Sequence, residues 1–216
     1  DCLLSRGLGD VYKRQVYEKS GLISRLDRYI WEQAAAKLGE WKKAGINMSI
    51  SVNISPKDFY YIDIFNTFAG LIKKYDIEPS NLKIEITETT IMSDVPNLMG
   101  ELEELRKAGF TLEMDDFGSG YSSLNTLKDI NVDVLKVDMG FIKETKNVKK
   151  SRIILASVIK MAKELNLLII TEGVETEEQV DNLTKLGCDV FQGYYFSKAI
   201  DVNEFEKRYL YRKKAG

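Results

Sequence analysis

Residues 46–54 read INMSISVNI, and the alternation within this stretch decides the fold. On an extended strand one face carries the apolar side chains Ile46, Met48, Ile50, Val52 and Ile54, and the other carries Asn47, Ser49, Ser51 and Asn53. A strand in an open doubly wound sheet is usually apolar on both faces, because helices cover both. A small, polar second face suits the lumen of a barrel near its active end. The stretch therefore favours a (β/α) barrel over a Rossmann-like sheet.

The rest of the chain repeats this unit. Residues 82–88 (LKIEITE) alternate in the same way, with Lys83, Glu85 and Thr87 on the polar face. Strands are predicted at 46–54, 82–88, 110–116, 132–138, 167–173 and 189–196, and helices near 22–44, 57–76, 94–108, 120–128, 148–165, 177–187 and 202–213. Alternating strands and helices predict a parallel α/β sheet. No linker-like stretch interrupts them, so a single domain is expected.

Composition narrows the function classes. The 216 residues are 44% hydrophobic and 30% charged, as in ordinary soluble globular domains. A net charge of -2 argues against binding duplex nucleic acid. With only two cysteines and no apolar run or leader of membrane or secretory type, a cytoplasmic location is expected, although the parent protein could be anchored through an upstream region.

The sequence contains no histidine. This absence excludes Ser-His-Asp and Cys-His catalysis and His-based zinc sites. Any catalysis must therefore use carboxylates, lysine, amides or a metal ion.

Polar residues collect where the predicted strands end, which is where barrels carry their sites. They are Asn53, Glu85, Glu88, Asp115, Asp116, Lys136, Asp138, Glu172, Glu175 and Gln192. Each taken alone could be a turn or helix-capping residue. Together, carboxylates converging on one mouth repel each other unless cations neutralise them. Oxygen ligands without His or Cys select Mg²⁺ or Mn²⁺, and adjacent Asp115 and Asp116 could each serve a different ion of a two-metal phosphoryl-transfer site.

Six strings resemble successive motifs of the EAL-domain family, whose members are bacterial cyclic di-GMP phosphodiesterases with a TIM-barrel-like fold. They are SVNISP (51–56), IEITET (84–89), DDFGSGYSSL (115–124), VLKVDMGFI (134–142), TEGVETEEQ (171–179) and CDVFQGYYFSK (188–198), and the resemblance covers residues 16–213 in order. It implies a TIM-barrel-like (β/α)8 fold of the EAL type. The implied reaction is metal-dependent hydrolysis of cyclic di-GMP to linear pGpG.

The resemblance also implies a role for each site residue. Asn53, Glu85, Asp115, Asp116 and Glu172 resemble the metal ligands, with Asp115 bridging two ions. Lys136 resembles the lysine beside the attacking water, and Glu172 the carboxylate often assigned as general base. Gln192 resembles the amide that holds a metal-bound water, and Glu88 resembles the residue that anchors the loop coupling dimerisation to the site. Asp138 and Glu175 resemble the acidic residues that flank the metals.

The beginning of the chain departs from the family pattern. Residues 1–15 show neither strand alternation nor a helical face, and they resemble translated adapter read-through. We interpret them as foreign to the natural gene, with a genuine flexible arm as the alternative, and 16–216 as one EAL-type domain. The family's first two strands, including the Glu-x-Leu strand that supplies a metal ligand, have no counterpart there. This chain is therefore expected to be inactive or nearly so and poorly stable, because two sheet edges would be open.

Two other functions remain open at this point. A non-catalytic cyclic di-GMP receptor or partner-binding EAL module would keep the barrel and bind nucleotide without metal or turnover. A Mg²⁺-dependent barrel of the enolase type would act on carboxylate substrates, but its Lys or His base arrangement has no match here. The resemblance further implies a homodimer and an upstream GGDEF or sensory domain in the native protein.

Overall fold

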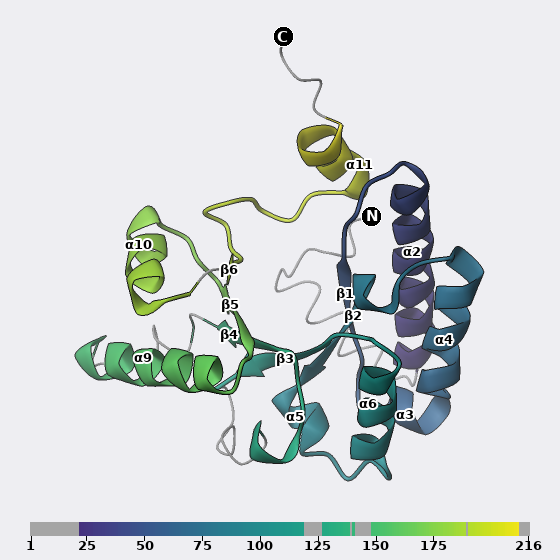
Figure 1. Cartoon of the computed structure of the whole chain (residues 1–216), viewed down its shortest axis with the longest axis horizontal. Coiled ribbons are helices and arrows are strands. Elements are labelled where there is room, and N and C mark those ends of the chain that lie inside the picture. Colours follow the sequence, from purple (N-terminus) through teal and green to yellow (C-terminus); the bar gives the residue numbers. More distant parts are fainter. Residues whose placement is uncertain (1–21, 119–126, 139, 141–147, 189, 212–216) are drawn as a thin grey trace.

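The computed structural model describes residues 22–118, 127–138, 140, 148–188 and 190–211. Within these residues six strands form one parallel sheet in the order β1-β2-β3-β4-β5-β6. They are β1 (Ile50–Asn53), β2 (Leu82–Thr87), β3 (Leu112–Phe117), β4 (Val134–Asp138), β5 (Leu168–Glu172) and β6 (Val190–Phe191). The sheet curls so that helices lie on its outer side (Figure 1). The fold is α/β and barrel-like, as the sequence predicts.

Helices follow the strands as expected for such a sheet. They are α2 (Ile23–Lys43), α3 (Asp58–Tyr61), α4 (Ile64–Tyr75), α5 (Glu88–Ile91), α6 (Leu98–Lys107), α9 (Val148–Glu164), α10 (Glu177–Leu186) and α11 (Val202–Phe205), with a 3-10 turn η1 (Pro79–Asn81) and a π-helical turn η2 (Glu206–Leu210). Most of the helix predicted at 120–128 lies outside the described residues. No helix among the described residues combines the length and apolar character that crossing a membrane requires.

The predicted two faces of β1 are confirmed. Val52 and Ile54 are 3% and 2% exposed and belong to the hydrophobic core between the sheet and the outer helices. Ser51 and Asn53 lie on the opposite face, where Asn53 bonds to Glu85 on the adjacent strand β2 and Ser51 reaches Glu113 on β3. The apolar face thus builds the core, and the polar face lines the concave side of the sheet.

Three predicted elements differ from the structure. The helix predicted over 57–76 is broken at Ile62, which is extended, because Asp63 starts a new helix by accepting a hydrogen bond from the Asn66 amide. The strand predicted over 46–54 pairs only from Ile50. The strand predicted over 189–196 ends at Phe191, because the backbone then turns and the Phe196 amide bonds to the Gly193 carbonyl.

The last described helix returns to the first. The Trp41 indole on α2 donates a hydrogen bond of 2.8 Å to the Glu206 carboxylate, and its ring lies 5.9 Å from that of Phe205 on α11. Figure 1 shows α11 beside the end of α2, beyond the segment that follows β6. Residues far apart in the sequence therefore hold the two sides of the curled sheet together.

Candidate metal centre

A bulge in β3 brings two consecutive aspartates to one side of the sheet. Successive side chains on a regular strand point to opposite faces. Here Met114 pairs with Leu135 of β4 and Phe117 pairs with Val137. Two residues therefore lie between the pairs on β3 but only one on β4, so β3 contains one extra residue. Asp116 takes up this residue with a positive φ of 55°, a left-handed conformation that Asp adopts more readily than most residues.

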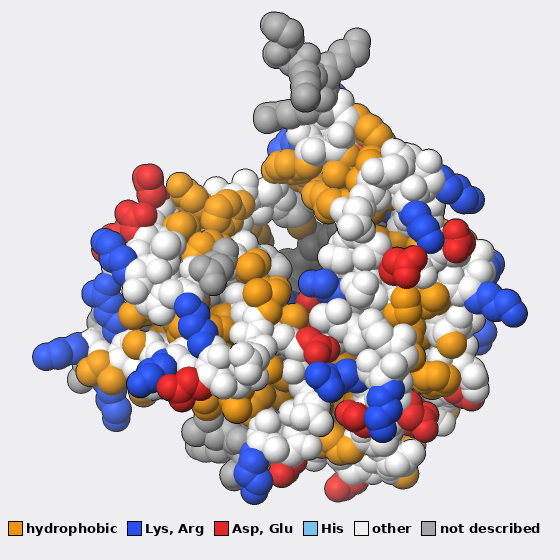
Figure 2. Space-filling model, in the orientation of Figure 1, with side chains coloured by type: hydrophobic (Ala, Val, Ile, Leu, Met, Phe, Trp, Pro, Cys, Tyr) orange, Lys and Arg blue, Asp and Glu red, His pale blue; other side chains and the backbone are white. Residues whose placement is uncertain are grey.

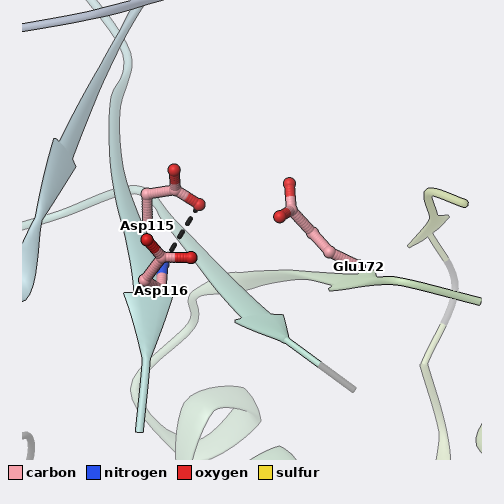
Figure 3. Close-up of side chains that lie close together, drawn as sticks. All are labelled: Asp115, Asp116 and Glu172. Atoms are coloured by element: carbon pink, nitrogen blue, oxygen red, sulfur yellow. Dashed lines mark hydrogen bonds between the residues drawn. The ribbon is translucent and has the colours of Figure 1, made fainter. Parts of the chain in front are cut away.

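The bulge places both carboxylates near a third. One ligand oxygen each of Asp115, Asp116 and Glu172 lies within 4.8 Å of the others. Figure 3 shows the three carboxylates directed toward a common space from β3 and from the end of β5. The Asp116 amide donates a hydrogen bond of 3.0 Å to an Asp115 oxygen, which fixes the Asp115 carboxylate. The arrangement offers several oxygen donors to one ion or to a pair of ions.

Lys136 on β4 lies at the centre of this acidic group. Its Nζ is 2.6 Å from Glu85 Oε1, 2.8 Å from Glu172 Oε1 and 3.2 Å from Asp115 Oδ1. The lysine side chain is only 3% exposed. Three strands therefore present carboxylates to one buried ammonium group.

The surroundings set the protonation of these groups. Burial acts to lower the pKa of Lys136, but the charges of Glu85, Asp115 and Glu172 outweigh it and raise the pKa. At neutral pH the Lys136 side chain is therefore a charged ammonium group that donates hydrogen bonds, and it does not act as a base. For Glu85, burial is the largest influence and raises the pKa, with Lys136 acting in the opposite direction.

Asn53 joins the group from β1. Its amide donates a hydrogen bond of 3.0 Å to Glu85 Oε2, which leaves its amide oxygen free to face another donor or an ion. Behind the strand, the buried Trp31 indole on α2 donates to the Asn53 backbone carbonyl at 2.9 Å. This helix contact fixes the end of β1, so that the Asn53 side chain meets β2 at a defined position.

The structure thus brings together six of the predicted site residues: Asn53, Glu85, Asp115, Asp116, Lys136 and Glu172. The other four lie at or after the ends of β2, β4, β5 and β6. Asp138 is the register neighbour of Glu172, and its carboxylate accepts the Gly140 amide. Gln192 follows β6 and is exposed, and Glu175 is exposed in the loop after β5. Glu88 is buried at the start of α5.

Sequence reasoning missed one further polar group on the concave face. Glu113 on β3 is 1% exposed, and its two oxygens accept hydrogen bonds from Ser51 Oγ at 2.9 Å and Lys83 Nζ at 3.0 Å. The sequence contained the signal, because two-residue spacing places Glu113 on the same face of the strand as Thr111 and Asp115.

The residues present fit a hard divalent cation. Among the described residues, the carboxylates of Glu85, Asp115, Asp116 and Glu172 gather with one ammonium group, that of Lys136, and Asp115 is fully buried. Such an excess of buried negative charge is costly unless cations offset it. The donors are all oxygens, and the sequence has no histidine, which favours Mg²⁺ or Mn²⁺ over zinc or copper.

Comparison with known proteins identifies the family. The sequence profile of the family described as "EAL domain" matches residues 14–199. The chain belongs to the EAL-domain family. Among its curated EAL relatives is the "bifunctional diguanylate cyclase/cyclic di-GMP phosphodiesterase MucR" of Pseudomonas aeruginosa, 34% identical over 188 residues. That match covers 87% of this chain and 27% of MucR, so the chain spans about a quarter of the relative.

Solved EAL structures share the fold. "PaMucR phosphodiesterase, c-di-GMP complex" has a TM-score of 0.81 at 33% identity, over 88% of this chain and 78% of that one. A manganese and cyclic di-GMP complex of Klebsiella pneumoniae BlrP1 has a TM-score of 0.71 at 29% identity, over 82% of this chain and 45% of that one. Relatives of this EAL domain are therefore named as phosphodiesterases, and neighbours in fold hold cyclic di-GMP.

Proposed function

We propose that the protein from which this chain comes hydrolyses cyclic di-GMP to linear pGpG in a reaction that depends on Mg²⁺ or Mn²⁺. The observation that carries the proposal is the convergence of four carboxylates and a protonated lysine at the strand ends of a curled parallel sheet. The family membership and the names of the relatives support the choice of substrate.

Asn53, Glu85, Asp115, Asp116 and Glu172 would hold two divalent cations, and Asp115 would contribute to both. When bound, such ions supply positive charge that stabilises both the attacking and the leaving oxygen of a phosphoryl displacement.

The chemistry of the chain's own residues follows from their protonation. Lys136, held as an ammonium group by its acidic neighbours, would orient the attacking water and offset charge that develops on the phosphoryl oxygens. Glu172 would accept the proton of that water. The water oxygen bonds to phosphorus, the bond from phosphorus to the 3′ oxygen breaks, and that oxygen takes up a proton. The products are a 5′ phosphate and a 3′ hydroxyl within one linear dinucleotide.

Supporting roles fall to residues around this centre. Gln192 would hold a water at the mouth, with Asp138 and Glu175 adding negative charge beside the ions. Glu88, buried at the start of α5, would anchor the loop that follows β2 and link it to a homodimer interface. We also propose a cytoplasmic location and an upstream GGDEF or sensory domain in the parent protein.

We further infer that the 216-residue chain itself turns over slowly or not at all. The described strands supply no counterpart of the family's Glu-x-Leu carboxylate. Loss of even a hydrogen-bonding partner of a metal ligand commonly reduces affinity or activity by about 10- to 100-fold, and loss of a ligand itself should cost at least as much. The segment 1–15 remains, in our interpretation, foreign to the natural gene.

The first test measures binding and turnover of cyclic di-GMP with and without Mn²⁺, by calorimetry and by chromatographic detection of pGpG. We expect metal-dependent binding, little pGpG, and loss of the metal dependence in Asp116→Asn. Asp129→Asn, an exposed aspartate outside the site, is the matched control. Fast pGpG formation would overturn the inferred inactivity, and metal-independent binding without turnover would favour a receptor. Absence of any binding would contradict the proposed function.

A further inference from the structure

Ser51, Lys83 and Glu113 form a second polar group on the concave face, one that the proposed reaction does not use. It joins three strands, because Ser51 lies on β1, Lys83 on β2 and Glu113 on β3. Glu113 is nearly inaccessible, and the Lys83 side chain is 22% exposed. We call these three residues the lower charge group.

The lower charge group lies directly beside the metal centre. In the sheet register Glu113 is the partner of Glu85, and Ser51 and Lys83 pair two residues before Asn53 and Glu85. Register partners in adjacent strands are about 5 Å apart, and their side chains leave the same face of the sheet. A charge in the lower group therefore acts on Glu85 at short range and across an environment with little water.

The two charges of this group have opposite consequences for a cation at the centre. The Lys83 ammonium alone would repel a divalent ion from Glu85, and its charge would attract the Glu85 carboxylate away from that ion. The Glu113 carboxylate pairs with Lys83 at 3.0 Å and offsets this effect. The Ser51 hydroxyl holds the second Glu113 oxygen, so that the carboxylate stays directed toward Lys83.

We propose that Glu113 is a positioning residue that neutralises Lys83 and thereby keeps the Glu85 carboxylate available to the divalent cation. The proposal rests on the proposed metal-dependent function and adds a residue to it. It also predicts a sign for each substitution, which a purely structural role of the ion pair does not.

The test is a double-mutant cycle read out by Mn²⁺ binding alone, through the electron paramagnetic resonance signal of free Mn²⁺. Glu113→Gln keeps the shape and the acceptor for Ser51 but leaves Lys83 unpaired, and it should weaken Mn²⁺ binding by about 10-fold or more. Lys83→Met should bind Mn²⁺ at least as tightly as the wild type. The double variant should recover binding close to the wild-type affinity, because no net charge remains in the lower group.

The matched control is the exposed pair Lys74 and Glu32, which joins α4 to α2 on the outer side of the molecule. Lys74→Met and Glu32→Gln change the same charges and should leave Mn²⁺ affinity unaltered. Thermal unfolding of every variant shows which ones fold. Weaker binding by Lys83→Met, or no recovery in the double variant, overturns the role of Glu113. A wild-type chain that binds no Mn²⁺ overturns the proposed metal-dependent function, and the inference with it.

Discussion

Lys136 is the residue on which the charge balance of the centre depends. Burial alone would favour its neutral form, but three carboxylates within 3.2 Å keep it charged. The same ammonium group reduces the repulsion among those carboxylates when no cation is bound. Its removal should therefore affect both stability and ion binding, in different directions.

Lys136→Met should destabilise the metal-free chain by about 3–5 kcal/mol, because breaking a buried ion pair leaves uncompensated charge. Saturating Mn²⁺ should restore part of that loss, since the cation replaces the ammonium among the carboxylates. Urea denaturation with and without Mn²⁺ measures both effects. Equal unfolding midpoints for the variant and the wild type without metal would contradict this account.

At the scale of single elements, α10 shows how local chemistry sets a boundary. Thr176 accepts a hydrogen bond from the Gln179 amide, and the Gln179 side chain accepts one from the Thr176 amide. The helix ends at Gly187, whose φ of +93° suits glycine. Both ends are therefore specified by residues adjacent in sequence.

Thr176→Ala should lower the free energy of unfolding by about 0.5–2 kcal/mol, because one amide at the start of α10 loses its acceptor. Thr184→Ala in the same helix is the control, since the exposed Thr184 hydroxyl only bonds back to the Val180 carbonyl. Urea titrations of the two variants measure the difference. A loss in Thr184→Ala as large as that in Thr176→Ala would show that capping is not the cause.

The start of α4 should give a measurable pH dependence. Hydrogen bonds from the Asn66 side chain and backbone amide lower the pKa of Asp63 in the folded state. A carboxyl with a lowered folded pKa stabilises the fold above its unfolded pKa, and this contribution is lost as pH falls through the folded value. The stability advantage of wild type over Asp63→Ala should therefore be full at pH 6 and diminish below about pH 4. Asp63→Asn, which keeps an acceptor without the charge, should show no such change with pH in thermal unfolding.

At the scale of the whole molecule, the described sheet has two edges. β1 pairs only with β2 and β6 only with β5 among the described strands. Apolar side chains near β6 are also exposed, with Val190 at 37%, Tyr194 at 60% and Phe196 at 52%. Figure 2 shows such side chains gathered over α11 and beside α10, whereas Lys and Arg are interspersed with Asp and Glu over the face in view. Unpaired edges beside apolar surface favour association between copies.

Val190→Lys should reduce aggregation, because a charged side chain on an edge strand opposes pairing with another chain. Light scattering during incubation at increasing protein concentration measures the effect. Ile153→Lys, at an exposed apolar position of α9 away from the sheet edge, makes the same change in charge and apolarity and is the control. Scattering that is unchanged in Val190→Lys would show that association does not involve the β6 edge.

The sequence alone predicted the order of strands and helices, because two-residue alternation and capping residues are local properties. It also put forward ten polar residues near the strand ends, among them the six that the structure brings together, since side chains at the ends of parallel strands converge. It misplaced the boundaries of β1 and β6 and the break at Ile62, which depend on pairing with distant segments.

Only the tertiary structure decided how the charges pair. The bulge that turns Asp116 toward Asp115 depends on the register between β3 and β4, and the three carboxylates around Lys136 come from three different strands. Glu113 and Lys83 are likewise 30 residues apart in sequence and meet only across the sheet. Periodicity shows which face a side chain occupies, whereas the distance between two charges depends on strand register and sheet curvature, which form only when the chain packs.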